Sequence, residues 1–398
     1  MKKIMVVIGT RPEAIKMSPV IKALQESKGL LPIVCLSGQH TDLARNVLKE
    51  FNLSVDIDLD IMTEGQDLFD ITSNCMLKIR QVLKRYAPDM VLVHGDTTTA
   101  MSSALSAHYL KIPVGHVEAG LRTGDKFSPF PEETNRKIIA TVADYNFAPT
   151  DRAVRNLLDE NVSKKSICKT GNTGIDALLW AINNGPDCSH LSYLFKGRTP
   201  ILMTAHRREN FGTAMKSIFS AVRRFALAGP NFQIIYPVHP NPKVKNLAQE
   251  FFSHVDNVSL TAPMGYFELI YLIQKAQFIL SDSGGIQEEA PTLKRPVIIL
   301  RDTTERPEIL ETKGGILAGS DEELILKLMT KLSDTSSPLY RSMRSGINPF
   351  GDGRAAARIV HAIENQATNK GEGIFHDAQV GTPLVLRLDD YREGQASQ

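Results

Sequence analysis

The chain has 398 residues, more than one hydrophobic core usually supports, so we predict two domains. Its 46 Lys and Arg residues nearly balance its 44 Asp and Glu residues. The formal net charge of only +2 excludes a nucleic acid or a membrane surface as a partner attracted by bulk charge. An anionic ligand would have to be held by local groups.

The sequence predicts a cytoplasmic protein. The apolar run in MKKIMVVIGTRPE reaches Gly9 and Arg11 too early for a secretion signal, and no run approaches the roughly 18 apolar residues of a membrane span. The four cysteines are scattered, with neither a CxxC pair nor metal-ligand spacing. This pattern favours reduced thiols in the cytosol and predicts no metal site.

Short runs of Val, Ile and Leu alternate with longer amphipathic stretches along the chain. The first half contains KIMVVIG, PIVCLSG, PDMVLVHGD and IPVGHVEAG, and the second contains PILMTAH, FQIIYPVH, AQFILSDSGG and RPVIILRD. Strands without polar alternation, separated by helices, are typical of parallel sheets covered on both faces. We predict an α/β fold with two doubly wound, Rossmann-like domains. Glycines in KTGNTGIDALLW place the join between residues 172 and 173.

Two strand-to-helix turns are candidate anion sites. In GTRPEAIK, Gly9 permits a tight turn, the helix start offers free N–H groups, and Arg11 and Lys16 add positive charge. The alternative is a capped turn with solvated charges. The motif is not GxGxxG, which argues against a nicotinamide cofactor.

The second turn, SDSGGIQEEA, has the same layout in the second half. The amides of Ser283, Gly284 and Gly285 could cradle a diphosphate, and Glu289, about one turn into the helix, could accept hydrogen bonds from ribose hydroxyls. The alternative is ordinary N-cap chemistry. Two consecutive glycines lower helix propensity where a plain cap would suffice, which favours a ligand.

Three segments place carboxylates near the carboxyl ends of predicted strands: HGDTTT with Asp96, GHVEAGLRTGD with Glu118, and PFPEETNR with Glu132. In a doubly wound sheet these ends converge on the ligand crevice. Close carboxylates separate each other's pKa values, so one can act as a base while another stays protonated. The alternative is that they cap helices or pair with Arg122 and Arg136.

Other polar residues also follow or end predicted strands. His206, followed by two arginines in AHRREN, could donate a proton or a hydrogen bond to a phosphate. His239 and His116 are similarly placed, with weaker cases. Arg306 in DTTERPE is expected near the same crevice, although a polar loop before a Pro-started helix explains it equally well.

Together, GTRPEAIKM, HGDTTT, PVGHVEAGLRTGD, PEETNR, TGNTGIDAL, AHRREN, YPVHPNP, SDSGGIQEEAP and RDTTERPE resemble the non-hydrolysing UDP-N-acetylglucosamine 2-epimerase family, in order from about Lys3 to Ile363. The resemblance implies the glycosyltransferase B-type architecture with the active site in an interdomain cleft. A C-terminal helix, about residues 353–366, would complete the first domain (1–172), and 173–352 would form the UDP-binding domain. We assign no role to 367–398. The resemblance also implies a homodimer.

The resemblance implies roles for individual residues. Arg11 and Lys16 would contact the nucleotide or its phosphates. The turn of Ser283, Gly284 and Gly285 would bind the diphosphate, and Glu289 would bind the ribose. The implied catalytic set is Asp96, Glu118, Glu132 and His206. Bacterial members are often activated by a second UDP-N-acetylglucosamine, and the residues that match this allosteric site are Gln39, Glu132, Arg207 and His239. Asp42 and Gly65 depart from the residues that some members carry, which weakens the case for activation.

The implied reaction needs no cofactor. A base removes the proton from the second carbon of the sugar as UDP leaves the first, giving 2-acetamidoglucal, and UDP re-adds after protonation on the opposite face. The alternatives are a hydrolysing epimerase that releases N-acetylmannosamine and UDP, a glycosyltransferase of the same fold, and a non-catalytic UDP-sugar sensor.

Overall fold

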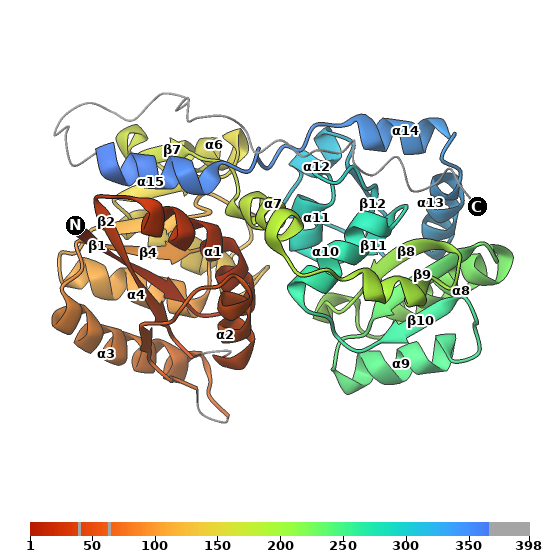
Figure 1. Ribbon diagram of the computed structural model, residues 1–398, viewed down its shortest axis with the longest axis horizontal. Coiled ribbons are helices and arrows are strands. Elements are labelled where there is room, and N and C mark those ends of the chain that lie inside the picture. The colour runs from red at the N-terminus through yellow and green to blue at the C-terminus, as the bar shows by residue number, and fades with distance from the viewer. Residues whose placement is uncertain (39–40, 63–64, 366–398) are drawn as a thin grey trace. The chain divides into compact units, whose positions relative to one another are not determined.

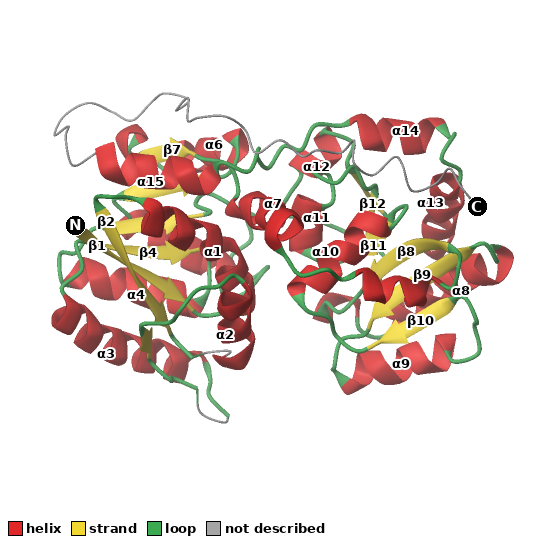
Figure 2. Cartoon of the chain, viewed as in Figure 1, coloured by secondary structure: helices red, strands yellow, loops and turns green. Residues whose placement is uncertain are grey.

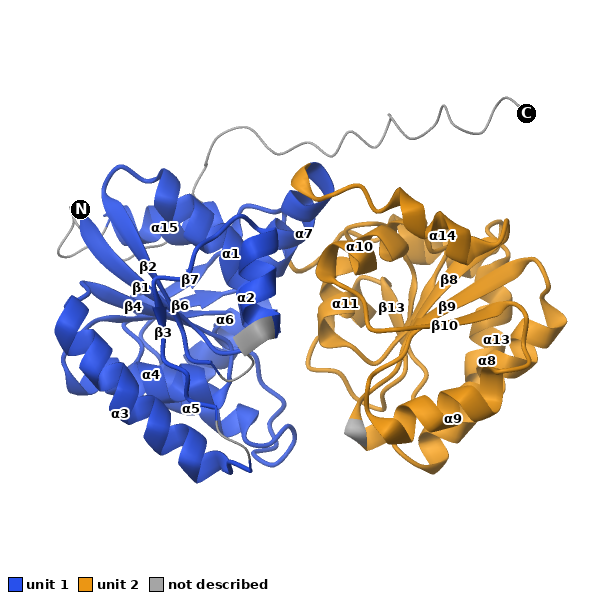
Figure 3. Ribbon diagram, turned by 60° about the horizontal axis from the view of Figure 1, so that its bottom comes forward, with its two compact units in different colours: residues 1–183, 351–398 blue, residues 184–350 orange. Residues whose placement is uncertain are grey.

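The computed structural model describes residues 1–38, 41–62 and 65–365 (Figure 1). The chain forms two compact units (Figure 3). Unit 1 contains residues 1–183 and the described residues from 351 onward, and unit 2 contains residues 184–350. Each unit is a parallel sheet with helices interleaved between its strands (Figure 2). The predicted α/β class with two doubly wound units is therefore confirmed.

Unit 1 contains a seven-stranded sheet in the order β3-β2-β1-β4-β5-β6-β7. Its strands are β1 (Lys2–Ile8), β2 (Leu30–Leu36), β3 (Ile57–Asp58), β4 (Met90–His94), β5 (Val114–Val117), β6 (Tyr145–Ala148) and β7 (Ile167–Lys169). Its α-helices are α1 (Arg11–Glu26), α2 (Thr41–Glu50), α3 (Leu68–Tyr86), α4 (Thr98–Tyr109), α5 (Glu132–Val142), α6 (Asp151–Asp159), α7 (Thr173–Asn184) and α15 (Ala355–Asn365).

The order of the strands reverses between β1 and β4, which are neighbours although two strands separate them in sequence. Helix α1 packs against α2 and α15, and α4 packs against α3 and α5, so helices cover both faces. Strand β1 is buried from Ile4 to Ile8, which explains its continuous apolar run. Because all strands run parallel, their carboxyl ends lie along one edge, where a reversal of strand order opens a crevice.

Unit 2 contains a six-stranded parallel sheet in the order β10-β9-β8-β11-β12-β13. Its strands are β8 (Thr199–Thr204), β9 (Phe232–Pro237), β10 (Val258–Thr261), β11 (Ile279–Ser281), β12 (Val297–Ile299) and β13 (Gly315–Leu317). Its α-helices are α8 (Thr213–Ala228), α9 (Pro242–Phe252), α10 (Tyr266–Lys275), α11 (Gly284–Glu289), α12 (Glu308–Glu311), α13 (Glu322–Ser333) and α14 (Pro338–Ser345). Phe219, Tyr236 and Phe252 are among the largest side chains of its core.

The C-terminal helix α15 belongs to unit 1. The buried carboxylate of Asp176 on α7 accepts hydrogen bonds from the amides of Ala355 and Ala356 at 3.1 and 2.8 Å, which satisfies two N–H groups at the start of α15. This contact also ties α7 to unit 1, so the compact unit extends past the join predicted at residue 172.

No helix among the described residues is both long and apolar enough to cross a membrane. The limits of the functional domains stay a prediction.

Candidate active site

The turn after β1 is built around a buried carboxylate. Thr10 is the N-cap residue of α1, and the Glu13 side chain folds back to accept hydrogen bonds from the amides of Gly9 and Thr10 at 2.6 and 2.7 Å. A Cβ at Gly9 would lie 2.9 Å from the Thr99 side chain, so this close packing needs glycine. Arg11 is the first residue of α1. The helix start is therefore held in a fixed turn.

Glu13 should make the stability of the fold depend on pH. Burial raises the pKa of Glu13 from 4.5 to about 7, so the folded chain retains a proton that the unfolded chain loses, and stability falls as pH rises through this window. Glu13→Gln keeps the shape without the charge. The variant's free energy of unfolding minus that of the unsubstituted protein should be about 2 to 3 kcal/mol larger at pH 8 than at pH 5. Denaturant unfolding of both proteins at the two pH values measures this gain, and a difference independent of pH would contradict it.

Glu118 lies directly after β5 in the left-handed backbone region, with φ of 64°. Its carboxylate accepts hydrogen bonds from the Lys16 ammonium group and, at 2.9 Å, from the Asn172 side chain. The Nε2 atom of His94, at the end of β4, lies 3.7 Å from the same oxygen. The structure thus brings two predicted site residues, Lys16 and Glu118, into direct contact through a nearly buried ion pair.

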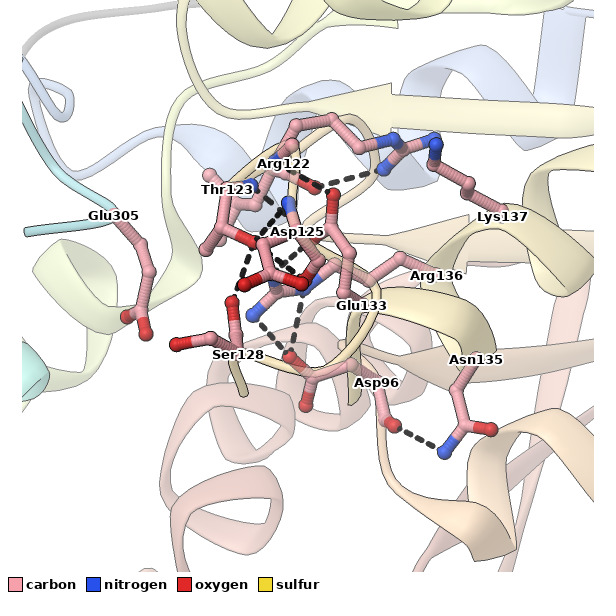
Figure 4. A network of polar contacts seen from close by, with 12 residues as sticks. Asp96, Arg122, Thr123, Asp125, Ser128, Glu133, Asn135, Arg136, Lys137 and Glu305 are labelled. Carbon is pink, nitrogen blue, oxygen red and sulfur yellow. Dashed lines mark hydrogen bonds and ion pairs between the residues drawn. The ribbon is translucent and has the colours of Figure 1, made fainter. Parts of the chain in front are cut away.

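Asp96 lies in the turn after β4, and its carboxylate forms an ion pair with the Arg136 guanidinium (Figure 4). Arg136 Nε and Nη2 lie 2.9 and 2.7 Å from Asp96 Oδ2, and Asn135 Nδ2 donates to the Asp96 carbonyl at 2.9 Å. The predicted alternative, pairing with Arg136, is therefore present. It leaves the Asp96 side chain 26% exposed, so the carboxylate can also contact a ligand.

Arg136 is itself held by Glu133, which is fully buried. Glu133 accepts from Arg136 Nη1 at 2.8 Å and from the amides of Thr123 and Gly124 at 3.1 Å each (Figure 4). This network fixes the loop after β5 against α5. Glu132, the neighbouring residue from the predicted catalytic set, begins α5 and is only partly buried.

His116 on β5 lies in the interior of unit 1 and contacts the backbone. It is fully buried, its Nε2 lies 2.7 Å from the Gly95 carbonyl, and burial lowers its pKa to about 3. A neutral imidazole in this position supports the turn that carries Asp96.

In unit 2, His206 follows β8 and is oriented by Asp282, a fully buried carboxylate. The backbone amides of His206 and Arg207 donate to Asp282 Oδ2 at 2.7 and 2.8 Å, and His206 Nδ1 lies 3.2 Å from Oδ1. Burial alone would raise the pKa of Asp282, but the contacts with His206 and Arg207 lower it. A charged Asp282 fixes one ring nitrogen of His206 and leaves Nε2 to face a ligand.

The His239 ring stacks on the His206 ring, with centroids 5.6 Å apart and an interplanar angle of 10°. Burial, with a contribution from His206, lowers the pKa of His239. Two of the predicted allosteric residues, Arg207 and His239, therefore adjoin the predicted catalytic histidine. Glu132, also predicted for the allosteric site, is in unit 1 at the start of α5, and Gln39 lies outside the described residues, as does the side chain of Asp42. Gly65 has a positive φ of 79°, and a Cβ added there would meet no atom within 4 Å.

The Ser283–Gly285 turn leads from β11 into α11. Ser283 is the N-cap residue, but its hydroxyl makes no cap hydrogen bond within the described residues, so plain capping does not account for the turn. A Cβ at Gly284 would lie 2.6 Å from Arg306 Nη1, so any larger residue there would displace the guanidinium from its present position. Arg306, whose sequence motif was weak, is thus placed directly at this turn.

Two carboxylates hold Arg306 in place. Its Nε donates to Glu288 at 2.5 Å and its Nη1 donates to Glu305 at 2.8 Å. Nearby on α11, Glu289 is mostly buried and accepts a hydrogen bond from the Tyr266 hydroxyl at 3.0 Å. Burial and the adjacent Glu289 raise the pKa of Tyr266 well above its ordinary value, so the phenol stays protonated and donates. Gly284, Gly285 and Glu289 thus belong to one short helix of unit 2, and Arg306 lies against its first residue.

Sequence reasoning missed several residues that support the site: Glu13, His94, Asn172, Tyr266 and Asp282. Asp282 lies in the motif SDSGG at a strand end, so its position was a usable signal. Tyr266 gave no signal, because only the fold brings it to Glu289 from another helix.

Parallel sheets with charged side chains at the carboxyl ends of their strands place the protein among the doubly wound α/β proteins, a class that binds its ligands at these strand ends. The family model for UDP-N-acetylglucosamine 2-epimerase matches residues 22–364. The chain belongs to this family, whose named reaction is an isomerisation.

Relatives and solved structures agree with this assignment. The UDP-N-acetylglucosamine 2-epimerase of Bacillus subtilis is 46% identical to the chain, over 91% of this chain and 94% of its own length. The Escherichia coli enzyme of the same name is 44% identical, over 91% of this chain and 98% of its own length. The Neisseria meningitidis enzyme, solved with UDP-GlcNAc bound, has a TM-score of 0.87 and 42% identity over 91% of this chain and 100% of that one. An S. aureus structure with UDP has a TM-score of 0.86 and 44% identity, over 92% and 97% of the two chains.

A glycosyltransferase from Rickettsia africae is also similar, with a TM-score of 0.61 at 14% identity, over 92% of this chain and 99% of that one. At this identity the likeness concerns the fold alone. It agrees with the glycosyltransferase B-type architecture predicted from the sequence.

Proposed function

We propose that the protein interconverts UDP-N-acetylglucosamine and UDP-N-acetylmannosamine without hydrolysis, by elimination and re-addition of UDP. The observation that carries this proposal is the pair of acidic groups at neighbouring strand ends of unit 1, each held by a cation: Glu118 with Lys16, and Asp96 with Arg136. Strands β4 and β5, which precede them, are paired directly. Carboxylates in such settings suit the removal and return of a proton.

Unit 2 would hold the UDP group. The amides of the Ser283–Gly285 turn and the Arg306 guanidinium would contact the diphosphate, and Glu289 would accept hydrogen bonds from the ribose. The relatives solved with UDP and with UDP-GlcNAc support this choice of ligand. Arg11 and Lys16 would add positive charge around the phosphates.

The chemistry would occur at the first two carbons of the sugar. A base takes the proton from the second carbon, the C–H electron pair becomes the double bond of 2-acetamidoglucal, and the bond from the first carbon to the UDP oxygen breaks with its electrons leaving on UDP. For the return, the second carbon is protonated on the opposite face and UDP re-forms its bond to the first carbon. We assign these proton transfers to the set Asp96, Glu118, Glu132 and His206.

Loss of UDP must supply much of the driving force, because the proton at the second carbon is only weakly acidic. Cationic groups that stabilise the diphosphate make UDP a better leaving group. With Nδ1–H directed at Asp282, His206 can donate from Nε2 to a phosphate oxygen when the ring carries its second proton. Exclusion of water from the reacting groups would protect the 2-acetamidoglucal intermediate.

Further parts of the proposal rest on the family resemblance and, for the location, on the sequence pattern. We propose a cytoplasmic homodimer that serves polysaccharide biosynthesis. We also propose that a second UDP-N-acetylglucosamine activates the enzyme at a site containing Gln39, Arg207 and His239. The stacking of His239 on His206 would give such an activator a direct route to the catalytic group.

Incubation of the purified protein with UDP-N-acetylglucosamine alone tests the function. Proton NMR should show the anomeric and second-carbon signals of UDP-N-acetylmannosamine appearing until equilibrium. Accumulation of free N-acetylmannosamine with UDP would show the hydrolysing reaction instead. A requirement for an acceptor would show a glycosyltransferase.

The proposed UDP site predicts that a single substitution at Glu289 weakens the binding of UDP. Glu289→Ala removes the carboxylate proposed for the ribose and should weaken UDP binding by about 2 kcal/mol or more. Tyr266→Phe keeps the carboxylate but removes the hydroxyl that orients it, so the loss should be smaller. Isothermal titration calorimetry measures both, and unchanged affinity in Glu289→Ala would remove Glu289 from the site.

A further inference from the structure

Glu13 makes more contacts than a helix cap requires. In a capping box, the N3 carboxylate accepts one bond, from the amide of the N-cap residue. Glu13 accepts that bond from Thr10 and two more, from the Gly9 amide at 2.6 Å and from the Thr97 hydroxyl at 2.6 Å. The residue is only 3% exposed, so its carboxylate is buried among these partners.

These bonds join two strand ends that carry different proposed roles. Gly9 and Thr10 follow β1 and precede Arg11, whereas Thr97 follows Asp96 in the turn after β4. The same Thr97 hydroxyl also accepts from the Ala100 amide at 3.0 Å, so it links Glu13 to the start of α4. No catalytic step described above uses Glu13.

Asp96 is therefore held from two sides. On one side, Asn135 and Arg136 from α5 bind its carbonyl and its carboxylate. On the other side, the next residue in the chain, Thr97, is bonded to Glu13 of α1. Reacting groups must be held within fractions of an ångström for efficient proton transfer, and a misplacement of about 1 Å can cost on the order of 100-fold in rate.

We propose that Glu13 is a positioning residue: through Thr97 it fixes the Asp96 carboxylate relative to the Gly9–Thr10 turn. The inference rests on the proposed function, because it takes Asp96 as a group that acts on the sugar. It differs from a purely structural role in its consequence. A structural cap protects the folded state, whereas a positioning residue changes turnover by molecules that are fully folded.

Steady-state kinetics of Glu13→Ala, Glu13→Gln, Thr97→Val and Thr97→Ser test the proposal, together with the Glu13→Ala/Thr97→Val double variant. Glu13→Ala should lower kcat by about 10- to 100-fold with KM for UDP-N-acetylglucosamine within about threefold. Glu13→Gln should recover most of this loss, since its carbonyl can accept both amides and its amide can donate to Thr97. Thr97→Ser keeps the hydroxyl and is the matched control for Thr97→Val.

The double variant decides whether Glu13 acts through Thr97. If it does, Glu13→Ala should cost less than about twofold in kcat when Thr97 is already valine. Each variant is assayed well below its own unfolding temperature, so that only folded protein is compared. Normal kcat in folded Glu13→Ala, or the same fold-loss in both backgrounds, would overturn the inference while the original chain remains active. An original chain that does not convert UDP-N-acetylglucosamine would overturn the proposed function itself.

Discussion

Glu118→Gln is expected to lower kcat for epimerisation by about 100-fold or more while leaving UDP affinity within about twofold. Glutamine has almost the same shape, but it cannot take up a proton at neutral pH. The Lys16 ammonium and the Asn172 amide both donate to one oxygen of Glu118, and the carbonyl oxygen of glutamine can take its place, so the substitution mainly removes the negative charge from a nearly buried site. Steady-state assays with UDP-N-acetylglucosamine, paired with calorimetric titration of UDP, measure the two effects separately.

Asp151→Asn is the matched control for this experiment. Asp151 begins α6, its side chain is 72% exposed, and it pairs with the exposed Lys169 ammonium at 3.0 Å. Removing that charge should leave kcat within about twofold, because an exposed ion pair contributes little. Near-normal turnover in Glu118→Gln would withdraw the proton-transfer role from Glu118.

Asp96→Asn is expected to have the second large effect, again about 100-fold or more in kcat with little change in UDP binding. The substitution removes the carboxylate proposed for proton transfer. It also weakens the contact with Arg136, whose Nε and Nη2 both approach one oxygen of Asp96, because the asparagine carbonyl oxygen carries no negative charge. Arg136 would keep its bond to the buried Glu133. The guanidinium should therefore stay in place, and the loss reports mainly on the carboxylate.

The two variants can also be distinguished from each other by exchange. Each protein is incubated in deuterium oxide with the product, UDP-N-acetylmannosamine, and separately with UDP-N-acetylglucosamine. If Asp96 and Glu118 serve opposite faces, each variant should suppress exchange from one sugar more strongly than from the other. Equal and near-normal exchange from both sugars in Asp96→Asn would remove Asp96 from the catalytic set.

Much of the fold could be predicted from the sequence because parallel strands leave a strong local signal. Within KIMVVIG and PDMVLVHGD, the segments Ile4–Ile8 of β1 and Met90–Val93 of β4 are buried and entirely apolar, as expected for parallel strands covered on both faces. The turns that carry Asp96, Glu118 and Ser283 follow directly from strand ends, which makes their position visible without any tertiary information. For the same reason Lys16 was found as a charged residue beside a predicted anion site, although its contact with Glu118 was not.

The supporting residues could not be predicted, because their roles depend on burial and on partners from distant segments. Glu13 looks like an ordinary helix cap until Thr97 reaches it from the turn after β4. In the sequence Arg306 resembles an ordinary loop residue, and only the fold shows that its guanidinium lies next to Gly284. The sequence-based alternative for Asp96, an ion pair with Arg136, and the catalytic interpretation are both compatible with the structure, since the pair leaves part of the carboxylate exposed.

The fate of the proton on the second carbon tests the central claim most directly. Elimination takes a proton from one face and re-addition delivers one to the other, so separate groups that exchange with solvent between the steps should serve the two faces. In deuterium oxide, UDP-N-acetylmannosamine formed from UDP-N-acetylglucosamine should carry deuterium at the second carbon, and prolonged incubation should label the recovered substrate at the same position. Proton NMR and mass spectrometry measure both. Epimerised product that fully retains the original proton would contradict elimination and re-addition.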